Sequence, residues 1–98
     1  GITEFDPAAA IGLHFHDCEE SVMVLEGDAI AEIDGIRHPL RTGDTTWIPA
    51  KVPHRFLNET NSVMRIFWTY ASVSATRTMV ATGICQSIDD EHAQATRT

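Results

Sequence analysis

Three histidines and one glutamate are the residues of this sequence whose types and spacing could do chemistry. His14 and His16 lie two positions apart, and Glu20 follows four positions after His16. Because alternate side chains of an extended strand leave the same face, both imidazoles would point the same way. His54 lies far downstream, directly after a proline. Imidazole binds several first-row metals and a carboxylate adds a hard oxygen. The four side chains are therefore a candidate ligand set for one divalent metal ion.

The spacing around these residues resembles the paired motifs of the cupin superfamily. The first motif reads HxH, three or four residues, Glu, six residues and Gly, and the matching positions are His14, His16, Glu20 and Gly27. The second reads Gly, five residues, Pro, four residues, His, three residues and Asn, and the matching positions are Gly43, Pro49, His54 and Asn58. The chain is thus similar to a small single-domain cupin, on motifs that span about half of it.

Two glycines of the family pattern are replaced. The glycine expected six residues before the first histidine is Ala8, and the one expected two residues after the motif's proline is Lys51. Both glycines shape turns and bind nothing, so their loss puts loop shape in question and not the metal site. The resemblance implies a cupin-type antiparallel jelly-roll barrel. We expect one domain over residues 1–98, with the barrel at 12–70 and a tail at 71–98.

Strands and tight turns account for the region that holds the candidate ligands. Residues 13–16 are predicted as a short strand. A second strand follows at Glu20–Glu26, where both faces are largely apolar and are expected to be covered. The dipeptide at 34–35, Asp-Gly, predicts a hairpin between Ala29–Ile33 and Ile36–Leu40.

The remaining elements complete an all-β pattern. A strand that Pro49 ends is followed by a strand that carries His54, and residues 63–70 form the longest β-favouring run. About seven short strands separated by turns favour an antiparallel sandwich or barrel. Residues 1–11 show no clear period. In the tail, residues 87–94 resemble a capped helix start, so we expect a short helix or an arm there.

Composition and charge limit the partners. The 98 residues are 43% hydrophobic, which suits one small domain, and no apolar run approaches the ~18 residues of a membrane span. Fourteen acidic and seven basic residues give a net charge of −7, which would repel nucleic acid. The first residues lack the pattern of a signal peptide. We therefore expect a cytoplasmic protein that binds neither nucleic acid nor membrane.

The other potential ligands are expected to take no part in the metal site. Cys18 and Cys85 are too few for a disulfide scaffold and indicate free thiols in a reducing compartment. Cys18 lies between ligands, but Glu20 already fills the set. His38 and His92 are expected to face solvent.

A bound metal would offset the burial of Glu20, since an unpaired buried carboxylate costs several kcal/mol. Four protein ligands would leave about two positions open on a metal that prefers about six. The residual positive charge would favour an anionic oxygen ligand, such as an enolisable or carboxylate-bearing compound. The ligand set accepts Fe, Mn, Ni, Zn, Co or Cu, so the identity of the metal stays open.

Side chains on neighbouring strands are candidates for a substrate pocket. We expect the pocket to be lined by Phe56, Val22, Val24, Ile48, Trp47 and Arg65. Of these, Arg65 could hold a substrate carboxylate.

Three functions remain open. Cupins include dioxygenases, decarboxylases, isomerases, cyclases and lyases, so the resemblance implies a metal-dependent enzyme acting on a small oxygenated organic compound, first of all a dioxygenase. A redox-neutral isomerase, cyclase or lyase is the second reading, and a non-catalytic small-molecule-binding cupin is the third. Because small cupins usually pair, and Met23, Leu25 and Met64 would leave apolar strand faces, we also expect a homodimer.

Overall fold

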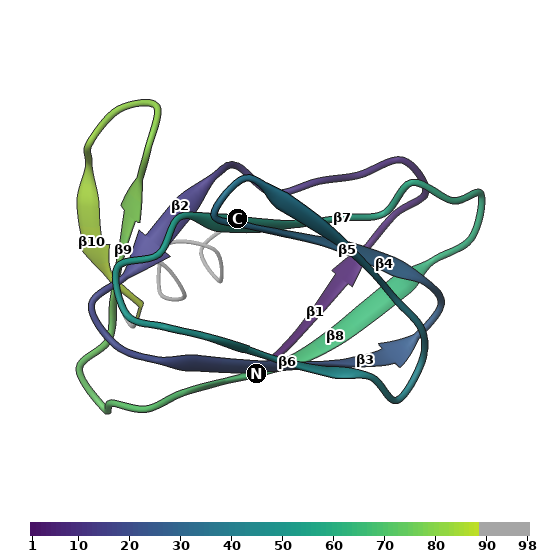
Figure 1. The fold of residues 1–98 in the computed structure, drawn as a ribbon, viewed down its shortest axis with the longest axis horizontal. Helices are drawn as coiled ribbons and strands as arrows, with labels where there is room; N and C mark the ends of the chain where they lie inside the picture. Colours follow the sequence, from purple (N-terminus) through teal and green to yellow (C-terminus); the bar gives the residue numbers. More distant parts are fainter. Residues whose placement is uncertain (89–98) are drawn as a thin grey trace, which may run out of the picture.

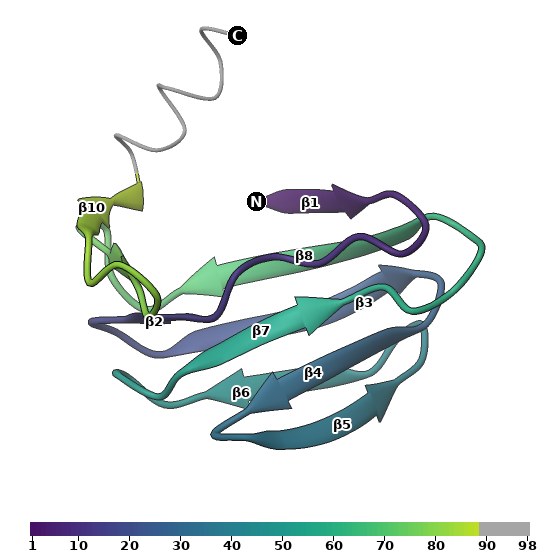
Figure 2. The ribbon, with the colours of Figure 1, turned by 90° about the horizontal axis from the view of Figure 1, so that it is seen from above.

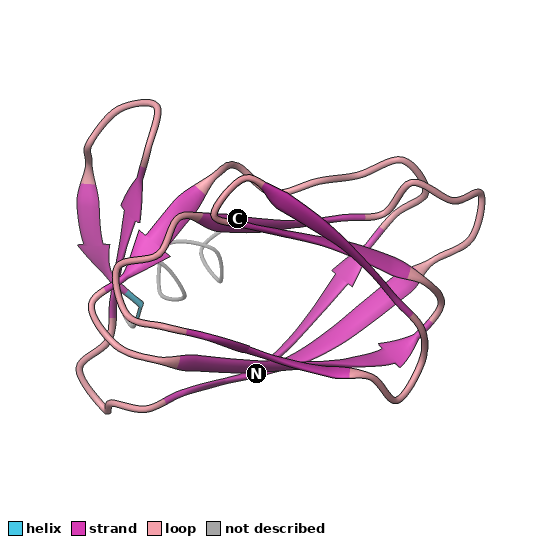
Figure 3. Ribbon diagram, viewed as in Figure 1, coloured by secondary structure: helices cyan, strands magenta, loops and turns pink. Residues whose placement is uncertain are grey.

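The computed structural model describes residues 1–88, which form two antiparallel β-sheets facing each other (Figure 1, Figure 2). Strands make up nearly all of the regular structure in this part of the chain (Figure 3). They are β1 (Ile2–Phe5), β2 (His14–His16), β3 (Glu20–Glu26), β4 (Ala29–Ile33), β5 (Ile36–Leu40), β6 (Thr45–Ile48), β7 (His54–Leu57), β8 (Met64–Tyr70), β9 (Thr76–Met79) and β10 (Cys85–Ser87). The predicted all-β antiparallel fold is confirmed. No helix of the described residues is long and apolar enough to cross a membrane.

The order of the strands explains how ligands far apart in the sequence meet. One sheet has the order β1-β8-β3-β6 and the other β10-β9-β2-β7-β4-β5. In the second sheet β2 pairs with β7, and this pairing sets His14 opposite His54. Glu20 begins β3 in the facing sheet. The metal-site candidates therefore come from both sheets and from three strands.

The core lies between the sheets and comes from alternate strand positions. Along β3, Glu20, Val22 and Val24 are buried, whereas Ser21 and Leu25 are exposed. The expectation that both faces of β3 are covered is wrong within this chain, because only the inner face meets the other sheet. The buried hydrophobic cluster consists of Phe5, Val22, Val24, Ala29, Ala31, Ile48, Phe56, Met64 and Ile66.

Three strands were not predicted. The strand β1 has only four residues and shows no alternation that its sequence could reveal. Every position of β9 is half-buried, so this strand also lacks the alternation of buried and exposed residues that marks a strand covered on one face. The hairpin formed by β9 and β10 extends the second sheet beyond β2, at one end of the barrel (Figure 1, Figure 2). Apart from its first two positions, the helix predicted over 87–94 lies outside the described residues.

Several turns carry left-handed backbone conformations, including the two positions that depart from the family pattern. Asp34 and Gly35 both have positive φ, 52° and 79°, as the predicted hairpin turn requires. Ala8 and Lys51, the two residues that replace family glycines, also have positive φ, 64° and 66°. A side chain strains this left-handed conformation by about 1–2 kcal/mol. The loops therefore keep the shape that glycine would give, and the replacements cost stability instead. Lys51 N–H also donates to His16 O at 2.7 Å, which ties this loop to the end of β2.

We predict that Lys51→Gly raises the free energy of unfolding by about 1 kcal/mol, because it removes the strain of a Cβ at positive φ. The matched control is Lys51→Ala, which removes the long side chain but keeps the Cβ and should change little. Urea unfolding followed by tryptophan fluorescence measures both. Equal stability of the two variants would contradict the assigned strain.

Candidate metal centre

Three histidine rings meet at the inner side of the second sheet. One ligand nitrogen from each of His14, His16 and His54 lies within 4.8 Å of the others. Their ring centroids are 4.5–5.1 Å apart, and each residue is at most 3% exposed. His14 and His16 share a face because they occupy the first and third positions of β2, and His54 joins them through the pairing of β2 with β7. The three histidines are thus positioned to bind a metal ion.

Backbone carbonyls fix which nitrogen of each ring faces the centre. The Nδ1 atom lies 2.7 Å from Gly12 O in His14, 2.9 Å from Thr76 O in His16, and 2.8 Å from Val52 O in His54. A carbonyl only accepts hydrogen bonds, so each Nδ1 carries a proton. In a neutral ring the other nitrogen, Nε2, then offers a lone pair. All three rings therefore present a free Nε2 lone pair when neutral.

The carboxylate of Glu20 lies against two of these nitrogens. Its Oε1 atom is 3.0 Å from His54 Nε2 and 3.4 Å from His16 Nε2. His16 Nε2 is buried without a hydrogen-bond partner among residues 1–88. Lone pairs of a carboxylate and of neutral imidazoles repel one another unless a proton or a cation lies between them. A divalent metal would satisfy the orphaned nitrogen and the carboxylate together, so the residues present fit such an ion.

The electrostatic surroundings keep His14 neutral and Glu20 charged. Burial, together with the charges of His54, His16 and Arg77, lowers the pKa of His14 from 6.5 to about 4, although its hydrogen bond to Gly12 opposes the shift. Burial by itself would raise the pKa of Glu20, but its close contacts with His16 and His54 outweigh burial and lower that pKa. At neutral pH His14 is therefore an imidazole and Glu20 a carboxylate, the forms that bind metals.

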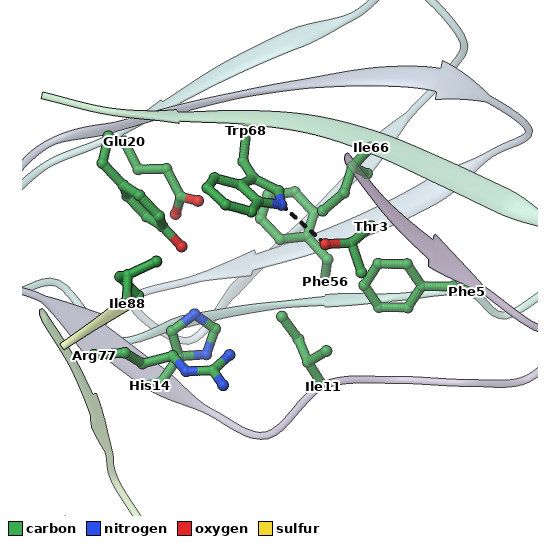
Figure 4. A pocket seen from close by; sticks show the side chains of 11 residues that line it. Thr3, Phe5, Ile11, His14, Glu20, Phe56, Ile66, Trp68, Arg77 and Ile88 are labelled. Atoms are coloured by element: carbon green, nitrogen blue, oxygen red, sulfur yellow. Dashed lines mark hydrogen bonds between the residues drawn. The ribbon is translucent and has the colours of Figure 1, made fainter. Parts of the chain in front are cut away.

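A cavity of about 230 Å³ adjoins the centre (Figure 4). His14 and Glu20 form part of its wall. The other lining residues are Thr3, Phe5, Ile11, Phe56, Ile66, Trp68, Tyr70, Arg77 and Ile88. The Tyr70 ring lies over His16, with centroids 4.6 Å apart, and the Trp68 indole N–H donates to Thr3 Oγ1 at 2.9 Å. The metal-site candidates thus open onto a small, largely apolar space.

Of the residues expected to form a pocket, Phe56 lines this cavity. Trp47 and Arg65 do not, contrary to expectation, because they lie on the outer face of the first sheet. Trp47 is 60% exposed and donates its indole N–H to Glu19 at 3.2 Å. The Arg65 side chain is 46% exposed and forms an ion pair with Glu4 at 3.6 Å. The three remaining candidates, buried in the core and absent from the cavity wall, are Val22, Val24 and Ile48.

Several lining residues were missed for identifiable reasons. Met64, Ile66, Trp68 and Tyr70 occupy alternate positions of β8 and share a face, as the strand period predicts, but Tyr70 was not singled out as a pocket residue. Arg77 comes from a strand that the sequence did not predict, and no pattern in the sequence singled it out. Within residues 1–88, His38 and Cys18 take no part in the group of close ligand atoms. His38 is exposed on β5, and His92 lies outside the described residues.

We predict that His16→Ala loses most of its bound metal, because His16 Nε2 is buried at the centre with no other partner among the described residues. His38→Ala, which removes an exposed imidazole from β5, is the matched control and should keep a metal-to-protein ratio near that of the parent. Elemental analysis after purification without chelator measures both. Equal losses in the two variants would mean that the ligands are misassigned.

Comparisons with known proteins agree with this geometry. A family model described as "Cupin domain" matches residues 1–70. Protein SchB of Streptomyces halstedii is 41% identical over 59 residues, which cover 59% of this chain and 43% of that protein. The dimethylsulfoniopropionate lyase DddW of Ruegeria pomeroyi is 39% identical over 54 residues, which cover 55% of this chain and 36% of the lyase. The chain thus aligns with less than half the length of these two curated relatives.

A solved structure also shares the fold. The structure of a predicted oxalate decarboxylase from Thermotoga maritima superposes with a TM-score of 0.67 and 23% identity. The match covers 70% of this chain and 61% of that one. This likeness extends the family match to the arrangement of the strands.

Proposed function

Because the chain belongs to the cupin family, we propose that it is a metal-dependent enzyme acting on a small oxygenated organic compound. One observation carries the proposal. Three buried histidine rings, each donating its Nδ1–H to a backbone carbonyl, bring their Nε2 atoms together, and the buried carboxylate of Glu20 lies 3.0 Å and 3.4 Å from two of these atoms. A protein that only needed a stable core would gain more from apolar side chains at these positions.

The cofactor in this proposal is one divalent transition metal, drawn from Fe, Mn, Ni, Zn, Co and Cu. His14, His16 and His54 would hold it through Nε2, and Glu20 would supply the fourth ligand. When bound, the metal would polarise an oxygen of the substrate or, if redox-active, support reaction with dioxygen. The chain's own contribution is to keep the rings in the right tautomer and to surround the site with apolar walls. Such walls exclude water and strengthen electrostatic interactions within the site.

Dioxygenase activity is the first candidate for the reaction. Sites that combine imidazoles with one carboxylate and keep positions open for other ligands suit iron(II) in oxygenases. A redox-neutral lyase is the second candidate, supported by the 39% identity to a dimethylsulfoniopropionate lyase. An isomerase or cyclase would use the same polarising chemistry without an oxidant, and a non-catalytic binding role would use the site for recognition alone.

We predict that the iron-loaded protein consumes oxygen in step with product formation when supplied with a suitable small hydroxy acid or diol. His54→Ala should abolish this uptake, because it removes a proposed ligand, whereas His38→Ala should not. The measurement is oxygen uptake with product analysis over a set of such compounds. Turnover under argon with manganese or zinc would contradict the dioxygenase assignment and would favour a lyase or an isomerase. Saturable binding without any product would leave only a binding function.

A homodimer through the outer face of the first sheet is a further part of the proposal. The register of β1, β8 and β3 lines up Ile2, Phe67 and Met23 across that face, and Ile2 and Phe67 are 56% and 42% exposed. A second copy would cover this row. Met64 takes no part, contrary to expectation, since it is fully buried opposite Phe5 on the inner side.

We predict that the protein has the mass of a dimer in light scattering at micromolar concentration and that Phe67→Asp is a monomer, because a carboxylate cannot be buried in that row without a partner. The matched control is Ile36→Asp, which adds the same charge at an exposed position of the other sheet and should stay dimeric. A monomeric parent would rule out the dimer.

A cytoplasmic location and the lack of binding to nucleic acid or membrane stay predictions. Cell fractionation and gel-shift assays test them.

A further inference from the structure

A single arginine enters the cavity from a strand outside the part of the chain that matches the family model. Arg77 is the one arginine or lysine among the cavity-lining residues within 1–88. It belongs to β9, whereas the family model ends at residue 70. The pairing of β9 with β2 sets Arg77 opposite His16, whose side chain faces the metal centre. Figure 4 shows the Arg77 guanidinium beside His14, with Glu20 entering the cavity from the opposite wall.

We propose that Arg77 binds a carboxylate of the substrate, and that the substrate is therefore a small carboxylic acid whose body fits the apolar part of the cavity. This proposal extends the proposed function. The reaction of the bound acid rests on that function, whereas the binding of the acid by Arg77 does not. A guanidinium has five N–H donors in a planar fork that matches the two oxygens of a carboxylate. Two of these donors can hold the acid while others keep contacts within the protein.

The size of the cavity limits the rest of the molecule. A cavity of about 150 Å³ is large enough to hold benzene. A volume of about 230 Å³ therefore accommodates one ring, or a chain of similar size, together with a carboxylate. Phe5, Phe56 and Ile66 form apolar wall for such a body, away from the charged groups (Figure 4).

The charges around the cavity favour an anion at this end. Among the lining residues within 1–88, Glu20 contributes one negative charge and Arg77 one positive charge. A bound dication would add two positive charges to these. Arg65, the residue expected to hold a substrate carboxylate, instead pairs with Glu4 on the outer face, and Lys51 is exposed. Arg77 is thus the positive side chain that can select for a carboxylate without itself binding the metal.

The test compares benzoate with benzamide, a neutral molecule of the same shape, as probes of the full chain in zinc-loaded and metal-free forms. Binding is measured by calorimetry and by the change in tryptophan fluorescence, to which Trp68 in the cavity wall contributes. The parent should prefer benzoate. Arg77→Gln should weaken benzoate binding by about 10–100-fold in both forms, as expected for the loss of charge-assisted hydrogen bonds, and should leave benzamide binding within about twofold.

Two further variants make the result specific. Arg77→Lys keeps the positive charge and should retain part of the preference, and Arg65→Gln makes the same substitution on the outer face and should change nothing. Circular dichroism checks that each variant is folded. Equal binding of the two probes by the parent, no binding of either probe, or an equal loss of both in Arg77→Gln would overturn the carboxylate site. Failure to bind zinc would instead count against the proposed function, and the metal-free measurement would still decide the role of Arg77.

Discussion

Burying three imidazoles and a carboxylate in one small barrel is the constraint on which the rest of the structure depends. Each ring is tolerated because its Nδ1–H donates to a backbone carbonyl, at Gly12, Thr76 or Val52. These hydrogen bonds satisfy one polar atom per ring and leave the other nitrogen directed at its neighbours. The loops before β2 and β7 and the first residue of β9 therefore act as a frame that orients the site. Unpaired buried polar atoms are costly, so such an arrangement is stable chiefly when something binds at its centre.

The loops that surround the site are themselves held by specific contacts. Asn58, which closes the second motif, is 1% exposed and donates its side-chain amide to the carbonyls of Phe5, Asp6 and Ser62. It thereby ties the chain after β1 to the turn before β8. Its place in the motif is explained by this structural role and not by chemistry at the metal. Ala8 and Lys51 show the opposite case. Their backbone keeps the positive φ that glycine would adopt at least cost, although neither residue is a glycine.

The sequence predicted the parts of the fold in which local patterns and the final structure agree. Strands such as β3, β4 and β5 have a clear period or a clear turn between them, and their predicted bounds agree with the structure. Clustering of His14, His16 and His54 followed from strand spacing and from the resemblance together. The pocket predictions that were wrong concern which face of a strand is covered. Trp47 and Arg65 belong to strands that carry cavity or core residues, yet the register directs them outwards, and composition alone does not reveal that.

The hairpin of β9 and β10 could not be foreseen, because β9 is half-buried throughout and its role depends on pairing with β2, some sixty residues earlier. Its contribution to the site is nevertheless twofold. Thr76 O accepts the hydrogen bond that fixes the tautomer of His16, and the next residue, Arg77, lines the cavity. Orientation of a proposed metal ligand and the proposed selection of a substrate thus involve neighbouring residues of one strand. Since this strand lies outside residues 1–70, the family match covers the three histidines, whereas the proposed choice of substrate depends on a segment that the match does not cover.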